Sequence, residues 1–283
     1  MGIKEDLRDI VTIMKFNLKI ESRYPISYVA GMLNLFFWLL SFAIFVLMLL
    51  GAKTEKSMVI GNLIAYGFAT YILFNAVISE VGFGIVRLQR RGTLEQIFLA
   101  PVSYWVLPLG LAGFTLIIHI AFMLMAIIMF VFLMGVPIVI VDPLMGFLGI
   151  VGLFIMIYGF ALLFAGLTIK TKRSSWAVVN VFQFIYMLFC GAFYPFNSLP
   201  ENIRIVSMLL PFSYGVDVFR TSIVGVEPEL FPNVVSLFGI IISGQIAEMI
   251  FVFCLGSIFL MYGYIFFKKT IDEGKRKGYL GTY

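Results

Sequence analysis

The side chains that could do chemistry are few in this 283-residue chain, and they form no catalytic set. Only 12% of the residues are charged, His119 is the single histidine, and the two cysteines, Cys190 and Cys254, lie in apolar runs. The sequence has no H-E-x-x-H, no G-x-S-x-G and no G-x-x-x-x-G-K-[ST], so the motifs of zinc peptidases, serine hydrolases and P-loop ATPases are missing. A lone histidine is neither a metal site nor a proton relay, and two cysteines at this spacing make no disulfide framework. We expect no catalytic residue, no metal and no cofactor in this chain.

Four charged residues lie in or beside apolar stretches, where a charge is costly and is a functional candidate by default. Glu80 either reaches the membrane interface or serves a function inside the bundle. Asp217 and Arg220 are three residues apart, close enough to pair on one helical face, as a structural pair or as a substrate site. Glu248 fits an interfacial position and a polar contact inside the bundle equally well.

The elements that must position these charges are membrane helices. The chain is 61% hydrophobic and 17% aromatic, with a mean hydropathy of +1.05, which is typical of an integral membrane protein. A span needs about 20 apolar residues, so the chain has room for about six. We predict an all-α membrane protein, one transmembrane domain over residues 1–283, with a six-span bundle over 29–267 and no binding of nucleic acid. The predicted spans are 29–50, 58–82, 104–134, 144–169, 176–193 and 243–267.

The distribution of Lys and Arg sets the predicted topology. With six spans, most of the 20 Lys and Arg residues fall on the side of the two termini, and only Lys53, Lys56, Arg204 and Arg220 fall on the other side. Reading 96–141 as two spans would instead place the basic C-terminal segment outside the cell. The positive-inside rule therefore predicts a multi-pass protein of a prokaryotic cell (plasma) membrane, with both termini cytoplasmic and a basic cytosolic tail over 268–283.

Two patterns predict how helices lie at the membrane surface and pack within it. Residues 1–28 are amphipathic, with apolar residues at helical spacing between Lys and Arg, and Pro25 ends the pattern. Such a helix lies in the membrane interface or is an ordinary solvated helix, and we favour the interface. In the fourth predicted span, Gly152, Gly159 and Gly166 are seven residues apart, which predicts a seam for close helix packing.

A short capped element follows the second predicted span, in RRGTLEQIFLAP. Thr93 and Gln96 fit a capping box, Leu94 and Phe98 share one face, and Pro101 ends the helix after about two turns. The predicted topology places it in the cytoplasm, where its apolar face either docks into a soluble partner or rests on the membrane. The candidate docking residues are Arg90, Arg91, Gly92, Thr93, Leu94, Glu95, Gln96, Ile97, Phe98 and Pro101.

A second unusual segment, 191–220, lies between the fifth and sixth predicted spans. Three prolines interrupt an apolar stretch, and Ser198 with Glu201 fits a capping box that begins a helix too short to cross a bilayer. We predict an extracellular re-entrant helical hairpin that gates the outer end of a pathway. Its candidate residues are Tyr194, Pro195, Pro200, Glu201, Pro211, Asp217 and Arg220.

Both segments resemble those of type 2 ABC exporter permeases. RRGTLEQIFLAPVSYW resembles the cytosolic loop of that family, and GAFYPFNSLPENIRIVSMLLPFSYGVDVFR resembles its block after span five, in the same order. One departure is the lead-in RLQRRG, which lacks the acidic residue often found before GTLE. The resemblance implies a transmembrane subunit that pairs with a second copy or a paralogue. It also implies cytosolic ABC ATPase subunits that carry ATP and Mg and receive the short helix as a coupling helix.

The expected function is therefore export driven by a partner ATPase, with membrane lipids around the bundle. Aromatic-rich, weakly charged spans suggest an apolar or amphipathic substrate of the drug, lipid or glycan-lipid type, although aromatics also fill bundles. We take Phe37, Tyr71, Phe74 and Asn75 as candidate pathway-lining residues. Two alternatives stay open, which are a polytopic membrane enzyme acting on lipids and an ion-coupled secondary transporter.

Overall fold

The protein is a bundle of long helices, described in a computed structural model over residues 3–23, 25–50, 55–100, 102–134, 138–171, 175–237 and 240–278. The predicted all-α architecture is confirmed in outline, with one small hairpin as the exception. The helices are α1 (Ile3–Glu21), α2 (Pro25–Leu50), α3 (Glu55–Arg90), α4 (Thr93–Leu99), α5 (Val106–Met134), α6 (Pro143–Thr171), α7 (Ser175–Phe189), the 3-10 turn η1 (Phe196–Ser198), α8 (Glu201–Leu209), α9 (Pro211–Val224) and α10 (Gly244–Lys277).

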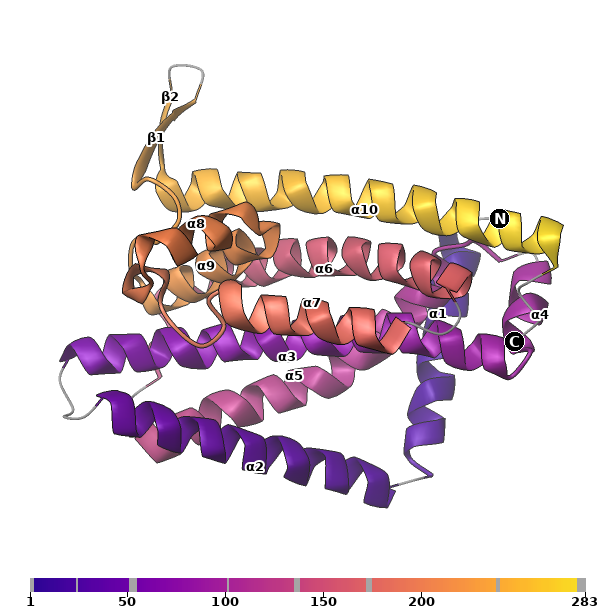
Figure 1. Ribbon diagram of the computed structural model, residues 1–283, viewed down its shortest axis with the longest axis horizontal. Coiled ribbons are helices and arrows are strands. Elements are labelled where there is room, and N and C mark those ends of the chain that lie inside the picture. The colour runs from indigo at the N-terminus through magenta and orange to yellow at the C-terminus, as the bar shows by residue number, and fades with distance from the viewer. Residues whose placement is uncertain are drawn as a thin grey trace.

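The long helices run along one direction, and the short elements gather at the two ends of the bundle (Figure 1). At one end lie α4, the last turns of α10 and α1, which crosses the direction of the other helices as an interfacial helix would. At the opposite end lie α8, α9 and the hairpin. We call these the α4 end and the α9 end. The two segments that the sequence singles out therefore lie at opposite ends of the molecule.

A helix corresponds to each of the six predicted spans, although α7 ends at Phe189, before the predicted end of the fifth span at 193. Four of these helices meet the length and apolarity needed to cross a membrane. Among the described residues these four segments are Val59–Arg90, Val106–Phe130, Pro143–Lys170 and Gly244–Lys277. The other two spans correspond to shorter apolar segments, Val29–Trp38 in α2 and Ala177–Phe189 in α7. The structure thus supports a multi-pass membrane protein, and the number six stays a prediction.

The predicted glycine seam is confirmed between α6 and α10. A Cβ atom on Gly159 would lie 2.4 Å from the backbone nitrogen of Leu260, and one on Gly263 would lie 2.1 Å from the carbonyl oxygen of Gly159. Cβ atoms at Gly152 and Gly166 would also meet α10 side chains, at 3.0 and 2.7 Å. Small residues let the two backbones approach where dispersion, rather than loss of water contact, drives helix association.

Two features near the C-terminus differ from the prediction. The start of the sixth span is preceded by an antiparallel hairpin of β1 (Val234–Leu237) and β2 (Ile240–Ser243), which the sequence analysis did not predict. The predicted tail over 268–283 is helical as far as Lys277, because α10 continues without a break. Thr270 and Ile271 are fully buried there, so packing against the bundle stabilises a segment that its charge suggested would be separate.

Candidate functional site

The short helix α4 is fixed to its own bundle through the apolar face that we expected to meet a partner. Leu94 and Phe98 are 0% and 3% exposed, and the Phe98 ring lies 6.1 Å from the rings of Phe267 and Tyr104, centroid to centroid. A seven-residue helix is marginal in water, so this packing is what stabilises it. The apolar face of α4 is therefore buried by the protein itself, and no contact with the membrane is needed to bury it.

The start of α4 differs in detail from the predicted capping box. Gly92 is the N-cap, with φ of 68°, and no side chain caps the helix; this left-handed conformation is why a glycine suits the turn. The Thr93 hydroxyl donates instead to the Leu88 carbonyl, at 3.1 Å. The Ser103 hydroxyl, which could have capped the next helix, donates to the Asp6 carboxylate at 2.9 Å and ties α1 to this loop. The predicted stop at Pro101 lies outside the described residues.

The side of α4 that faces away from the bundle is polar, apart from one leucine. Arg90, Arg91, Glu95 and Gln96 are exposed, and Leu99 is 71% exposed. Ile97 is half-buried between the two faces. A partner at the α4 end would therefore meet these polar and charged side chains and Leu99, which together we call the α4 docking surface, rather than Leu94 and Phe98.

At the α9 end, the predicted pair of Asp217 and Arg220 is confirmed inside a larger buried ion cluster. Both side chains are 0% exposed and their charged atoms approach to 3.4 Å. Arg220 also pairs with Glu229 and donates to the carbonyls of Gly191 and Tyr194, at 2.9 and 2.8 Å. The cluster joins the segment after α7 to α9 and to the segment before the hairpin.

The carboxylates of this cluster also accept hydrogen bonds from backbone N–H groups. One Asp217 oxygen accepts the backbone N–H groups of Glu229 and Leu230, at 2.7 and 2.9 Å. Glu229 accepts the backbone N–H of Phe196, whose ring lies 4.5 Å from the Arg220 guanidinium carbon. The sequence analysis missed Glu229, because it lies nine residues after Arg220 in a segment without helical periodicity.

The prolines of this region act as boundaries, but the second capping box does not form. Pro195 and Pro200 are the N-caps of η1 and α8, and Pro211 is the first residue of α9. The Ser198 hydroxyl donates to the Pro195 carbonyl, and no side chain caps α8, so Glu201 is merely an exposed acid in its first turn.

The structure shows the surroundings of Glu248 and Glu80, for which the sequence left two alternatives each. Glu248 is 0% exposed, so its side chain lies inside the protein, and neither carboxylate oxygen has a hydrogen-bond partner among the described residues. Glu80 pairs with Arg87 at 2.8 Å and is partly exposed. Within the described parts of the chain, no three His, Cys, Asp or Glu side chains come together as a metal site would require.

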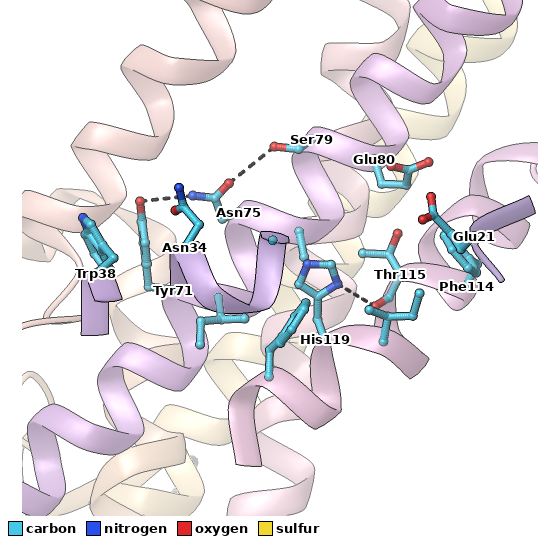
Figure 2. Close-up of a pocket in the computed structure, with 15 residues that line it drawn as sticks. Glu21, Asn34, Trp38, Tyr71, Asn75, Ser79, Glu80, Phe114, Thr115 and His119 are labelled. Atoms are coloured by element: carbon cyan, nitrogen blue, oxygen red, sulfur yellow. Dashed lines mark hydrogen bonds between the residues drawn. The ribbon is translucent and has the colours of Figure 1, made fainter. Parts of the chain in front are cut away.

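A cavity of about 590 Å³ lies between α2, α3 and α5, with the end of α1 at its edge. Figure 2 shows that α3 contributes a polar row to it. The Asn75 amide donates to the Tyr71 hydroxyl at 3.1 Å, and the Ser79 hydroxyl donates to the Asn75 oxygen at 3.4 Å. Gln183 of α7 donates to the same Asn75 oxygen and to Ser79, both at 2.8 Å, so the row also faces α7.

The structure separates the four predicted pathway residues. Tyr71 and Asn75 line the large cavity. Phe74 is 1% exposed, stacks on Tyr186 at 3.9 Å and lines a separate apolar cavity of about 180 Å³. Phe37 is 59% exposed and is not part of either lining. Trp38 and His119 line the large cavity but were not predicted, because nothing in their spacing distinguishes them from bundle filler.

Apolar helices of spanning length, a polar row within the bundle and short helices at opposite ends define a multi-pass membrane protein with polar groups inside its bundle. Residues 8–224 match the ABC-2 type transporter family. The match covers more than half of the chain, so the chain belongs to this family and is an ABC transporter permease. No curated protein matches the chain at the sequence level.

Proposed function

We propose that this permease is the transmembrane subunit of an ATP-driven exporter in the cell membrane of a prokaryote. It works with separate ABC ATPase subunits that bind ATP and Mg, and with a second permease copy or a paralogue. The α4 end faces the cytoplasm, as the excess of Lys and Arg near the termini favours. The substrate is an apolar or amphipathic molecule. The permease crosses the membrane six times.

The attachment of α4 is the observation that carries this proposal. A helix that transmits force must expose a surface to the partner and be fixed to the elements that move. The α4 docking surface is exposed, while Leu94 and Phe98 are buried against the bundle. Through Phe98 and Phe267, α4 contacts α10, and α10 packs along α6 through the glycine seam. Movement of α4 by a partner ATPase would therefore be passed to the long helices, which must have two arrangements for coupling to occur.

The opposite end supports a role as an outer gate. The helices α8 and α9 have 9 and 14 residues, too short to cross a bilayer. Most of α9 is buried, and its ion cluster fixes the segment after α7 against it. Irregular backbone at this depth needs cover from protein or from a water-filled space. A well-covered, short-helix element at the far end of the bundle from α4 is suited to close the pathway there.

A first experiment tests the docking surface by reversing the charge at Glu95 and placing a charge at Leu99. Glu95→Arg combined with Leu99→Glu should reduce co-purification of the cognate ATPase at least about tenfold, because both side chains are exposed and lie outside the core. The matched control is Glu227→Arg, which changes an exposed acid three residues after α9 and should leave the complex intact. Unchanged ATPase binding and unchanged export in the double variant would refute the proposal.

A second variant separates transmission from docking. Phe98→Leu keeps an apolar side chain on the buried face that stabilises α4 but removes the ring contact with Phe267. We expect it to keep the ATPase bound while ATP hydrolysis loses its dependence on transport. Export that continues without any ATPase would instead favour an ion-coupled transporter, and turnover of lipid by the permease alone would favour a membrane enzyme.

A further inference from the structure

The cavity between α2, α3 and α5 is divided by chemistry along its length. Figure 2 shows Glu21 and Glu80 together at one end and Trp38 and Tyr71 together at the other, with the His119 ring between them. Its volume of about 590 Å³ lies within the range of sites for drug-sized molecules. A ligand that fits such a cavity has a polar or charged end and an apolar end.

The charged end of the cavity is negative. Glu21 and Glu80 are the two charged residues of the lining, and no Lys or Arg contributes to it. Glu80 pairs with Arg87, whose side chain is 48% exposed and lies outside the lining. Glu21 makes no ion pair with any residue that the structure describes. An anion placed here would meet the carboxylate of Glu21, which has no cation beside it among the described residues, whereas a cation would gain Glu21 as an unpaired partner and Glu80 as a second acceptor that it would share with Arg87.

The middle of the cavity favours the same sign of charge. The His119 Nδ1 lies 2.9 Å from the Thr115 carbonyl oxygen, which can only accept a hydrogen bond. The proton of the neutral ring is therefore on Nδ1, and Nε2 remains an acceptor. Thr115 is 2% exposed and also lines the cavity, so this part of the wall is held in place.

The other end of the cavity is aromatic. The rings of Trp38 and Tyr71 are stacked, with centroids 5.9 Å apart and an angle of 25° between their planes. Phe122, beside His119, and Phe114, which Figure 2 shows beside Glu21, add apolar surface to the rest of the lining. Aromatic faces bind apolar bodies and also attract cations, by about 0.5–2 kcal/mol in measured cases. Both ends of the cavity therefore select against anions.

We propose that this cavity binds an organic cation with an apolar body, the charge beside Glu21 and Glu80 and the body against Trp38 and Tyr71. The binding site stands on the geometry alone. Its identification as the site of the exported substrate rests on the proposed function, and it sharpens the expected substrate from amphipathic molecules in general to amphipathic cations.

Two probes of equal shape and opposite charge test the proposal. Tetraphenylphosphonium and tetraphenylborate are offered to the purified permease, without ATPase, in a neutral maltoside detergent, and binding is measured by equilibrium dialysis with empty micelles subtracted. We expect the cation to bind at least about tenfold more tightly than the anion, which corresponds to the free energy of one favourable charge contact. Equal affinity for the two probes would overturn the proposal, because an apolar cavity without charge selection would give that result.

Variants of the two acids locate the selectivity. Glu21→Gln with Glu80→Gln should lower the affinity for tetraphenylphosphonium about tenfold and leave that for tetraphenylborate unchanged or higher. Glu21→Gln alone should give a smaller loss of about threefold, and it keeps the test valid if the double variant does not fold, because Glu21 takes part in no described ion pair. Glu227→Gln, an exposed acid at the α9 end, is the control and should change neither affinity. Cation binding that survives loss of both acids would contradict the assignment.

Two further arms identify the source of the cation and separate this proposal from the proposed function. Added sphingosine, a lipid amine with a positive charge and no phosphate, should compete with tetraphenylphosphonium if the natural ligand is a lipid amine, and should have no effect if it is a soluble cation. Export that depends on the α4 docking surface, in a permease that does not discriminate between the probes, would refute the cation site alone. Cation-selective binding with no ATPase association would refute the proposed function alone.

Discussion

The two ends of the bundle are held together by opposite means. At the α9 end, Arg220, Asp217 and Glu229 are buried, with exposures of 0%, 0% and 8%, and backbone groups complete their hydrogen bonds. At the α4 end, the ion pairs of Glu80, Lys170 and Glu273 involve side chains that are 25–65% exposed. Exposed pairs contribute little because water screens them, whereas buried pairs are costly to disrupt.

This difference indicates what each end can do. The buried cluster joins three segments, and these cannot separate gradually. If one charged residue moved away, the others would remain charged and without contact with water. The cluster is suited to an element with one closed arrangement. The α4 end depends instead on the packing of Leu94 and Phe98, and its exposed charges remain available to a partner. The three predictions below test this contrast, from the largest expected effect to the smallest.

Removal of Arg220 should cause the largest loss of stability. Arg220→Met keeps most of the side-chain volume but leaves Asp217 and Glu229 buried without a cation, which should cost about 3–5 kcal/mol of unfolding free energy. The matched variant Arg87→Met breaks the exposed pair with Glu80 and should cost less than about 1 kcal/mol. Denaturant unfolding in detergent, followed by tryptophan fluorescence, measures both. Equal losses in the two variants would show that the ends do not differ as we infer.

Closing the glycine seam should have an intermediate effect, because α6 and α10 connect the two ends. Gly159→Ala places a methyl group 2.4 Å from the Leu260 nitrogen and 2.5 Å from the Phe259 carbonyl carbon. Backbone cannot rotate away as a side chain can, so the helices must separate, at a cost of about 1–3 kcal/mol. Gly82→Ala on α3 is the control, since its nearest neighbour would be Val179 Cγ2 at 3.9 Å. It should be neutral or stabilising by up to about 1 kcal/mol. A Gly159→Ala protein as stable as wild type would show that close packing of α6 and α10 at this glycine does not contribute to stability.

The sequence predicted the long helices and α4 because both depend on strong local signals. In a membrane protein, a run of about 20 apolar residues almost always forms a membrane-spanning helix. The helical spacing of Leu94, Ile97 and Phe98 identifies the apolar face of α4. The sequence signals were weaker for features that depend on tertiary contacts, such as the hydrogen bonds at helix ends. Neither capping box forms, because the Thr93 and Ser198 hydroxyls find backbone carbonyls instead.

The candidate sites were predicted only in part, for related reasons. Asp217 and Arg220 were found because three residues separate them on one helix, whereas Glu229 joins them only through the fold. The cavity brings together Glu21, Trp38 and His119 from three different helices, and no spacing in the sequence connects them. The β1–β2 hairpin was missed because its apolar residues run directly into those of α10, so that hydropathy alone shows one continuous segment.

Loss of one hydrogen bond at the α4 end should have the smallest effect of the three, and it should depend on pH. The Tyr104 hydroxyl donates to the Asp272 carboxylate at 2.6 Å and so joins the loop before α5 to the end of α10. This bond to a carboxylate, followed by partial burial, raises the pKa of Tyr104 from 10.0 to about 12. Since the folded protein favours the neutral phenol, the contribution of the bond is complete below pH 10 and is lost as the pH rises from 10 to 12.

Tyr104→Phe should therefore lower the unfolding free energy by about 1 kcal/mol at neutral pH. The difference between the variant and wild type should shrink above pH 10. Tyr262→Phe, on an exposed face of α10, is the control and should change stability at no pH. A loss at neutral pH as large as that of Arg220→Met would mean that the α4 end is held as firmly as the α9 end.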